Sequence, residues 1–211
     1  MHLEVFADAA LGNAEKDLET KSVMGYFIAL SNQDMKVSPL HWKSKVIEKV
    51  AEDVKTAETL ALETAVDDSI HLADLIAEIY TGEEEPTVKI PLKINEDSAS
   101  LIESLYSTKK VKRKTMRVVI SSIQQNMKRK RIQDIFHVKS QDQLADVFTK
   151  SGVHTDRILN VMLSGSMRIK QDQMSNDMSL KSYDMISENK NLNQNFKLRD
   201  VNQKRRPGVY R

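Results

Sequence analysis

Four acidic residues stand at points of the sequence where an acid is costly unless it has a partner. Asp8 ends a stretch of strand-forming residues, and Asp97 ends a later one, just where a helix is predicted to begin. Glu58 lies on the apolar side of a long predicted helix, in register with its hydrophobic stripe. Asp146 lies in the first turns of a helix predicted after Ser140. Burying an unpaired acid costs free energy, so these four positions are candidates for chemistry.

Clustered carboxylates are suited to binding divalent cations. If the strands that end at Asp8 and Asp97 are neighbours in a sheet, both acids lie near one end of it. Helices could then bring Glu58 and Asp146 over them. Such carboxylates repel one another unless cations neutralise them, and hard oxygen ligands without Cys or His favour Mg²⁺ or Mn²⁺.

Each acid also has a purely structural explanation when it is taken singly. Asp8 and Asp97 could be turn or N-cap residues, and Asp146 could be a surface acid of a helix. Glu58 could pair with Lys55. The four positions together are more informative than any one of them.

The elements that would position these acids follow from the hydrophobic periodicity. Strands are predicted over 3–8, 23–30, 36–42, 88–94 and 131–138, and helices over 53–80, 98–106, 114–129 and after Ser140. The order is βββαβααβα. We therefore expect an α/β fold with a five-stranded mixed sheet, in which a three-strand meander is followed by two parallel strands, flanked by helices.

The composition restricts the class of protein. The chain has 211 residues and no cysteine, so disulfides, thiol nucleophiles and zinc–cysteine sites are excluded. No apolar run approaches the ~18 residues of a membrane span, and the first residues do not resemble a secretory signal. We expect a cytoplasmic or nuclear protein. Residues 1–165 are expected to form one domain, and 166–211, which are polar and end in basic residues, a disordered tail.

The charge is unevenly distributed along the chain. Residues 1–105 contain 9 Lys and Arg against 21 Asp and Glu, whereas residues 106–211 contain 23 against 9. The two halves could simply neutralise each other. Alternatively, the acidic half gathers divalent cations and the basic half binds a polyanion such as nucleic acid.

Six short blocks occur in an order that carries a family resemblance. They are 8–13 (Asp-Ala-Ala-Leu-Gly-Asn), 25–27 (Gly-Tyr-Phe), 42–45 (Trp-Lys-Ser-Lys), 56–62 (Thr-Ala-Glu-Thr-Leu-Ala-Leu), 97–109 (starting Asp-Ser-Ala-Ser) and 143–150 (Gln-Leu-Ala-Asp-Val-Phe-Thr-Lys). Together they resemble the ribonuclease H domain at the C-terminal end of copia-type retrotransposon Pol polyproteins. The similarity spans roughly residues 3–165.

The resemblance implies a ribonuclease H-like fold and a metal-dependent endonuclease. The substrate would be the RNA strand of an RNA–DNA hybrid, and two Mg²⁺ or Mn²⁺ ions would be the cofactors. The family's metal-binding acids correspond to Asp8, Glu58, Asp97 and Asp146. Asp8 would bridge the ions, Glu58 and Asp97 would favour one, and Asp146 the other. For the third acid, an alternative alignment would substitute Asn95 for Asp97.

Basic residues of the second half are the candidates for phosphate contacts. They are Lys109, Lys110, Lys112, Arg113, Lys114, Arg117, Lys128, Arg129, Lys130 and Arg131. The alternative is a solvated basic helix without a ligand. Recognition of the hybrid would depend on groove shape and 2′-hydroxyls.

Three functions remain open from the sequence. The first is the endonuclease, with a reverse transcriptase domain expected upstream in an intact element. Because the chain starts just before the first predicted strand, we expect a polyprotein fragment or a separately encoded remnant. The second is a decayed or repurposed retroelement domain that binds nucleic acid or a protein without cleavage. The third is a basic-tailed interaction protein unrelated to retroelements.

Overall fold

A five-stranded mixed sheet forms the centre of the computed structural model, which describes residues 1–12, 21–34, 36–108, 111, 113–167 and 169. Its strands are β1 (His2–Ala10), β2 (Val23–Ser31), β3 (Val37–Val46), β4 (Leu92–Glu96) and β5 (Ile132–His137), in the order β3-β2-β1-β4-β5. The first three are antiparallel, and β1, β4 and β5 run parallel. The predicted fold class is therefore confirmed.

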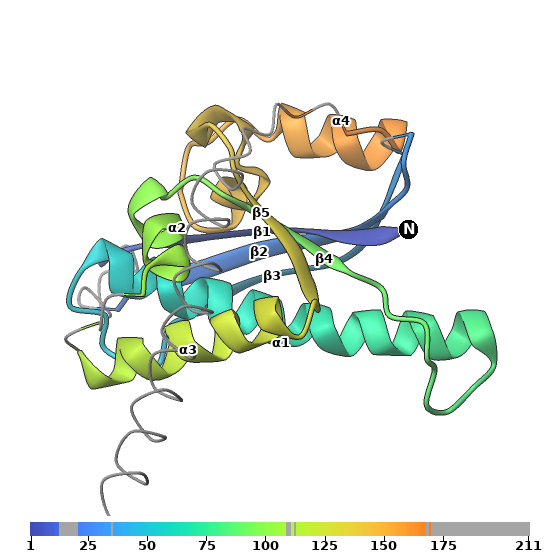
Figure 1. Cartoon of the computed structure of the whole chain (residues 1–211). Coiled ribbons are helices and arrows are strands. Elements are labelled where there is room, and N and C mark those ends of the chain that lie inside the picture. Colours follow the sequence, from blue (N-terminus) through green and yellow to red (C-terminus); the bar gives the residue numbers. More distant parts are fainter. Residues whose placement is uncertain (13–20, 35, 109–110, 112, 168, 170–211) are drawn as a thin grey trace, which may run out of the picture. The chain divides into compact units, whose positions relative to one another are not determined.

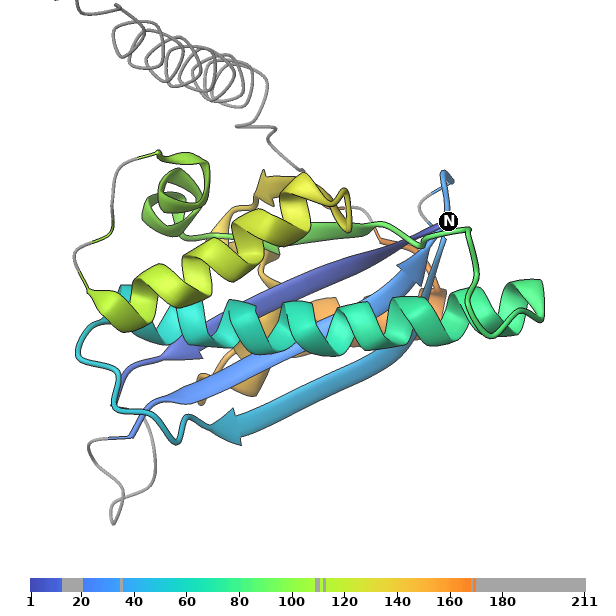
Figure 2. The same cartoon turned by 60° about the horizontal axis from the view of Figure 1, so that its bottom comes forward.

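The central strand β1 is buried along its whole length, because both faces of the sheet are covered. The helices α1 (Val54–Thr81), α2 (Ala99–Tyr106) and α3 (Lys114–Lys128) pack on one face, and α4 (Asp156–Ser164) lies on the other (Figures 1 and 2). Side chains of β1 alternate between the two. Val5 and Ala7 contribute to the cluster under α1, whereas Phe6 contributes to the cluster under α4. None of the helices in the described ranges is both long and apolar enough to span a membrane.

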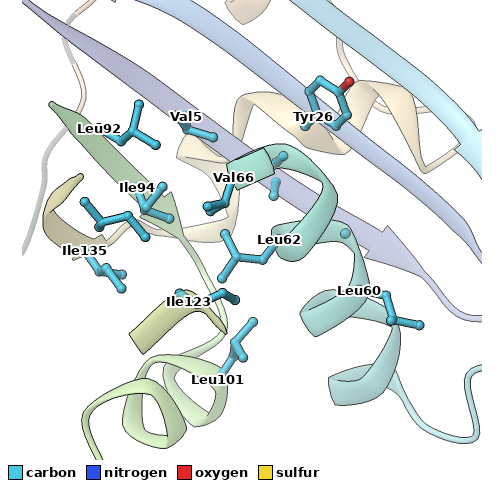
Figure 3. Close-up of a cluster of buried hydrophobic side chains, with 14 of the residues drawn as sticks. Val5, Tyr26, Leu60, Leu62, Val66, Leu92, Ile94, Leu101, Ile123 and Ile135 are labelled. Carbon is cyan, nitrogen blue, oxygen red and sulfur yellow. The ribbon is translucent and has the colours of Figure 1, made fainter. Parts of the chain in front are cut away.

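Helix α1 has clear start and stop signals. The carboxylate of Asp53 caps its N-terminus by accepting a hydrogen bond of 2.7 Å from the Thr56 backbone, and Gly82 ends it in a left-handed conformation. Its apolar stripe packs on the sheet, and Figure 3 shows Val66 near Val5 and Ile94. The predicted helix over 53–80 is confirmed, and with it the positioning of Glu58 in the second turn.

Two predicted strand boundaries are wrong. β4 begins at Leu92 and not at residue 88, since Pro91 immediately before it has no backbone N–H for the sheet; the Pro91 carbonyl instead accepts a hydrogen bond of 2.9 Å from Leu3. β3 continues beyond the predicted residue 42 to Val46, because β2 pairs with it as far as Val23.

The helix predicted after Ser140 is also wrong. The chain there forms two short 3₁₀ turns, η2 (Ser140–Asp142) and η3 (Leu144–Phe148), and an α-helix appears only at α4. The signal for α4 was present: Ile158 and Val161 have helical spacing, both are buried, and Gly165 follows as a left-handed C-cap.

The ordered packing continues slightly past the domain end predicted at residue 165. Ser166 forms a β-bridge with Lys36, and Met167 is fully buried in the cluster with Phe6. The rest of the predicted tail lies outside the described residues, apart from Ile169, which packs against the same cluster. The proposed division of the chain at residue 165 therefore stays a prediction.

Candidate active site

Asp8 lies near the C-terminal end of the central strand and is almost completely buried, with 4% of its surface exposed. It pairs with Gly25 of β2 in the antiparallel ladder. On its other side, β4 runs parallel to β1, with Asn95 opposite Phe6. Asp97 follows the last residue of β4. Because β1 and β4 are parallel neighbours, Asp8 and Asp97 lie at the same end of the sheet, as expected from the sequence for neighbouring strands.

Burial dominates the electrostatics of Asp8 and raises its pKa to about 6, from an ordinary value near 3.8. The neighbouring charges of Asp146 and Asp97 act in the same direction. A hydrogen bond from Thr149 and the charge of Lys150 lower the pKa, but do not cancel the effect of burial. Asp8 is therefore an acid in a site that favours its protonated form even with the Lys150 ammonium beside it.

The segment that follows η3 supplies the groups that bind Asp8. The Thr149 hydroxyl donates a hydrogen bond to an Asp8 carboxylate oxygen. The Lys150 ammonium lies 2.7 Å from Oδ1 of Asp146 and 3.4 Å from Oδ2 of Asp8. Asp146 and Lys150 are also joined through the backbone, where the Lys150 N–H donates a hydrogen bond of 3.0 Å to the Asp146 carbonyl. The tight turn of η3 brings Asp146 beside Asp8, although the predicted helix is absent.

Glu58 approaches from α1 and is half-buried. Burial raises its pKa, a hydrogen bond with Ser98 lowers it, and the charge of Asp97 raises it again. The charge of Lys150 also acts on Glu58. Helix α1 therefore places Glu58 within electrostatic reach of the end of β4, on the side of the sheet opposite to η3.

All four predicted acids thus interact electrostatically with one ammonium group, and two of them, Asp8 and Asp146, contact it. Burial works to lower the pKa of Lys150, but its hydrogen bond to Asp146 and the charges of Asp8 and Asp97 outweigh this effect and raise the pKa overall. Across the described ranges, no three His, Asp or Glu side chains are arranged as a ligand set for one metal ion. In this arrangement, the cation among the carboxylates is Lys150.

Comparison with solved structures identifies the architecture. A crystal structure of LC11-RNase H1 in complex with an RNA/DNA hybrid matches with a TM-score of 0.50 at 18% identity, covering 74% of this chain and 99% of the other. The structure of LC11-RNase H1, isolated from compost by a metagenomic approach, matches with 0.50 at 17%, covering 75% and 98%. The chain has the ribonuclease H fold.

A third similar structure is the N-terminal RNase H domain of rv2228c from Mycobacterium tuberculosis, fused to maltose binding protein, with a TM-score of 0.47 at 16% identity and coverage of 78% and 95%. No protein-family model matches the chain, and no curated protein matches it either. At these identities the likeness establishes the ribonuclease H fold and leaves the chemistry to the site itself.

Within this ribonuclease H fold, the position of Asn95 differs from that of Asp97. Asn95 is fully buried inside β4, and its amide donates a hydrogen bond of 2.6 Å to Glu4, which also contacts His2 at 2.9 Å. Asp97 instead acts on Asp8, Glu58 and Lys150. The geometry therefore favours Asp97 as the third acid.

Glu96 is a fifth acid of the site that the sequence reasoning missed. It is 1% exposed, and Oε1 accepts a hydrogen bond of 3.1 Å from the Ser98 backbone. Burial, followed by the charge of Asp97, raises its pKa well above the ordinary value. A signal was available, since Glu96 shares the strand parity of Leu92 and Ile94 and must point toward the helices that cover them.

Gln143 attaches η3 to the sheet of the ribonuclease H fold. The Gln143 amide donates to the Ala7 carbonyl at 3.0 Å, and its side-chain oxygen accepts from the Ala145 backbone at 3.3 Å. At the other end of η3, the Ser44 hydroxyl donates to the Phe148 carbonyl at 2.6 Å. These bonds hold the turn that carries Asp146 against β1, β2 and β3.

The predicted phosphate-contacting residues fall into separate groups. Lys109, Lys110 and Lys112 lie outside the described residues. Arg113 pairs with Glu52 at 2.7 Å and Asp53 at 3.1 Å, beside the N-terminus of α1. Arg131 is mostly buried and pairs with Asp74 at 2.8 Å. Both arginines therefore have structural partners.

The remaining basic residues are distributed along α3. Lys114 is exposed at its N-terminal end, next to Arg113, and Arg117 donates to the Val111 carbonyl. At its C-terminal end the exposed residues are Lys128, Arg129 and Lys130. There the chain enters β5, at the end of the strands opposite to the end where Asp97 lies. Since α3 has 15 residues, about 22 Å separate its ends.

Proposed function

We propose that this chain is a metal-dependent endonuclease of ribonuclease H type that cleaves the RNA strand of RNA–DNA hybrids. The observation that carries the proposal is the ion pairing of Asp8 and Asp146 with one ammonium group, that of Lys150, whose charge also acts on Glu58 and Asp97. In agreement with this, a similar structure is a ribonuclease H1 bound to an RNA/DNA hybrid.

The donor set fits hard divalent cations. It consists of carboxylates, and the buried Asp8 already binds a cationic group, the Lys150 ammonium, 3.4 Å away. We propose that Asp8, Glu58, Asp97 and Asp146 hold two Mg²⁺ or Mn²⁺ ions. Such ions, when bound, activate a water molecule and stabilise the leaving 3′ oxygen.

The residues of the chain then have distinct roles. Asp8 provides the central carboxylate, which Thr149 orients through its hydrogen bond. Glu58 acts from α1, Asp97 from the end of β4, and Asp146 from η3. Exposed basic residues, with Lys114 nearest to the start of α1, contribute attraction for the phosphate backbone without reading sequence.

The test is cleavage of an RNA–DNA hybrid whose RNA strand is end-labelled, with Mg²⁺ and with or without a chelator. Asp8→Asn should abolish cleavage. Asp34→Asn is the matched control, since Asp34 is exposed in the turn after β2, at the opposite end of the β1–β2 ladder from Asp8. Cleavage that survives the chelator or the Asp8 substitution would refute the site. Hybrid binding without any cleavage would favour a repurposed domain.

We further propose that the domain derives from a copia-type Pol polyprotein. The support is the sequence resemblance in six ordered blocks, combined with the ribonuclease H fold. An intact element would encode a reverse transcriptase upstream. The origin is tested by sequencing full-length transcripts that contain this reading frame, together with the surrounding genomic locus. We expect either an in-frame reverse transcriptase before residue 1 or the remains of one nearby in the locus.

A further inference from the structure

Lys150 has the geometry of a cation that occupies the site. Its ammonium is within 3.5 Å of both carboxylate oxygens of Asp8, and at 2.7 Å it forms a direct ion pair with Asp146. Asp8 is 4% exposed, so a full negative charge there is costly without a compensating positive one. Lys150 is the group that supplies this charge.

The backbone next to Lys150 is firmly held, whereas its side chain reaches solvent. Thr149 is buried and bonds to Asp8, and the Phe148 carbonyl accepts from Ser44. The Lys150 side chain, by contrast, is 37% exposed. A long, flexible side chain anchored at its base can turn outward into water without any change of the backbone.

A divalent ion and this ammonium exclude one another. Mg²⁺ requires oxygen ligands at about 2.0–2.1 Å, so an ion shared by Asp8 and Asp146 would take the same oxygens that Lys150 now binds. The two positive charges would also repel each other at contact distance. Glu58, on α1, and Asp97, just after β4, form no ion pair with Lys150 and feel its charge only at longer range.

We infer that Lys150 is a built-in counter-ion for the Asp8–Asp146 pair, so that a divalent ion binds between these two carboxylates only by displacing it. The inference rests on the proposed function and deepens it. It makes the two cation positions unequal: one ion binds without competition from Lys150, and the second, between Asp8 and Asp146, competes with it.

The experiment counts Mn²⁺ bound per chain, by electron paramagnetic resonance of free Mn²⁺ and by calorimetry. The wild type should bind one ion readily and a second at least about tenfold more weakly. Lys150→Met should strengthen the second binding by about tenfold or more, and Lys150→Arg should not. Lys45→Met is the matched control, because Lys45 also forms an ion pair, with Glu48 at 2.9 Å, that includes none of the four acids.

Stability without metal gives a second readout that is independent of cleavage. In chelator, Lys150→Met should lower the melting temperature, and Mn²⁺ should restore it. If this variant does not fold in chelator, adding Asp146→Asn should recover folding, since it removes the carboxylate left unpaired. A double variant that still does not fold would overturn the inference.

The two proposals fail in different ways. Equal Mn²⁺ binding by the wild type and by Lys150→Met would overturn the role of Lys150, even if both proteins cleave the hybrid. A wild type that neither cleaves the hybrid nor binds Mn²⁺ through Asp8 would overturn the proposed function, and the inference with it.

Discussion

Gly25 lies directly opposite Asp8 in the β1–β2 ladder, and the missing side chain at Gly25 is what lets the turn carrying Asp146 reach the site. A β-carbon on Gly25 would stand 2.6 Å from Cβ of Phe148 and 2.9 Å from Cγ2 of Thr149. Carbon atoms that are not bonded to each other essentially never approach this closely in a packed protein. The chain at Phe148–Lys150 could not then lie against β2 in its present position.

We therefore predict that Gly25→Ala destabilises the protein by about 1–3 kcal/mol, because Phe148 and Thr149 must move. Displacing Thr149 also disturbs Asp8, so cleavage should fall by about 100-fold. Urea unfolding and the hybrid assay measure both effects. Gly82→Ala is the control: no atom lies within 4 Å, so only the left-handed backbone is strained, at about 1 kcal/mol, and cleavage should not change. Equal effects of the two substitutions would contradict the prediction.

Asp8→Asn should stabilise the metal-free protein above neutral pH. The folded-state pKa of about 6 exceeds the ordinary value, so the folded chain binds the proton more tightly than the unfolded chain does. The free energy of unfolding of the wild type therefore falls as pH rises from about 4 to 6, by up to ~3 kcal/mol, and stays lower above that window.

The free energy of unfolding of Asp8→Asn should not fall in this way as the pH rises, because the amide does not ionise. Urea unfolding in chelator should show Asp8→Asn more stable than the wild type by about 1–3 kcal/mol at pH 7.5, with the difference disappearing toward pH 4. Mn²⁺ should stabilise the wild type and not the variant. A variant that is less stable than the wild type at pH 7.5 in chelator would show that the charged form of Asp8 is favoured by the fold.

Substitutions in β4 distinguish the two alignments of the third acid. Asp97→Asn should abolish cleavage and leave the fold intact, because Asp97 is only partly buried. Asn95→Asp should destabilise the protein by about 2–4 kcal/mol, since it places a second carboxylate against the buried Glu4 in place of a donor at 2.6 Å. The hybrid assay and thermal unfolding separate these outcomes. If both variants still cleave the hybrid, neither Asp97 nor Asn95 is the third acid of the site.

The salt dependence of hybrid binding should differ between the two ends of α3. Lys114 lies next to Arg113 at the start of α1, whereas Lys128 lies about 22 Å away at the far end of the helix. We predict that Lys114→Ala lowers the slope of log affinity against log salt by about 0.7–0.9, the value of one phosphate contact. Lys128→Ala removes the same charge and should leave the slope unchanged. Binding is measured at several salt concentrations with both lysine substitutions made in the Asp8→Asn protein, so that the hybrid is not cleaved. Equal slopes for the two lysine variants would refute a phosphate contact restricted to the Lys114 end.

Much of this arrangement follows from the order of residues. Alternating strand formers before Asp8 and the helical stripe around Glu58 predict the element types, and three strands in a meander followed by β–α alternation predict a mixed sheet. The residue types also indicate the cation chemistry, since carboxylates without cysteine favour hard ions. These inferences depend on local periodicity and on chemical identity, both of which are written in the chain.

Other features depend on contacts between distant segments and needed the folded structure. A two-residue strand period places Asn95 and Asp97 on the same face, but only the register of β4 against β1 separates a buried partner of Glu4 from an acid at the sheet edge. The turn at η3 is held against the sheet by the Gln143 amide, which donates a hydrogen bond to Ala7 of β1. Lys150 enters the carboxylate cluster for the same reason: its position is fixed by packing of Phe148 and Thr149 over Gly25, 123 or more residues earlier in the chain, and no local pattern encodes such a contact.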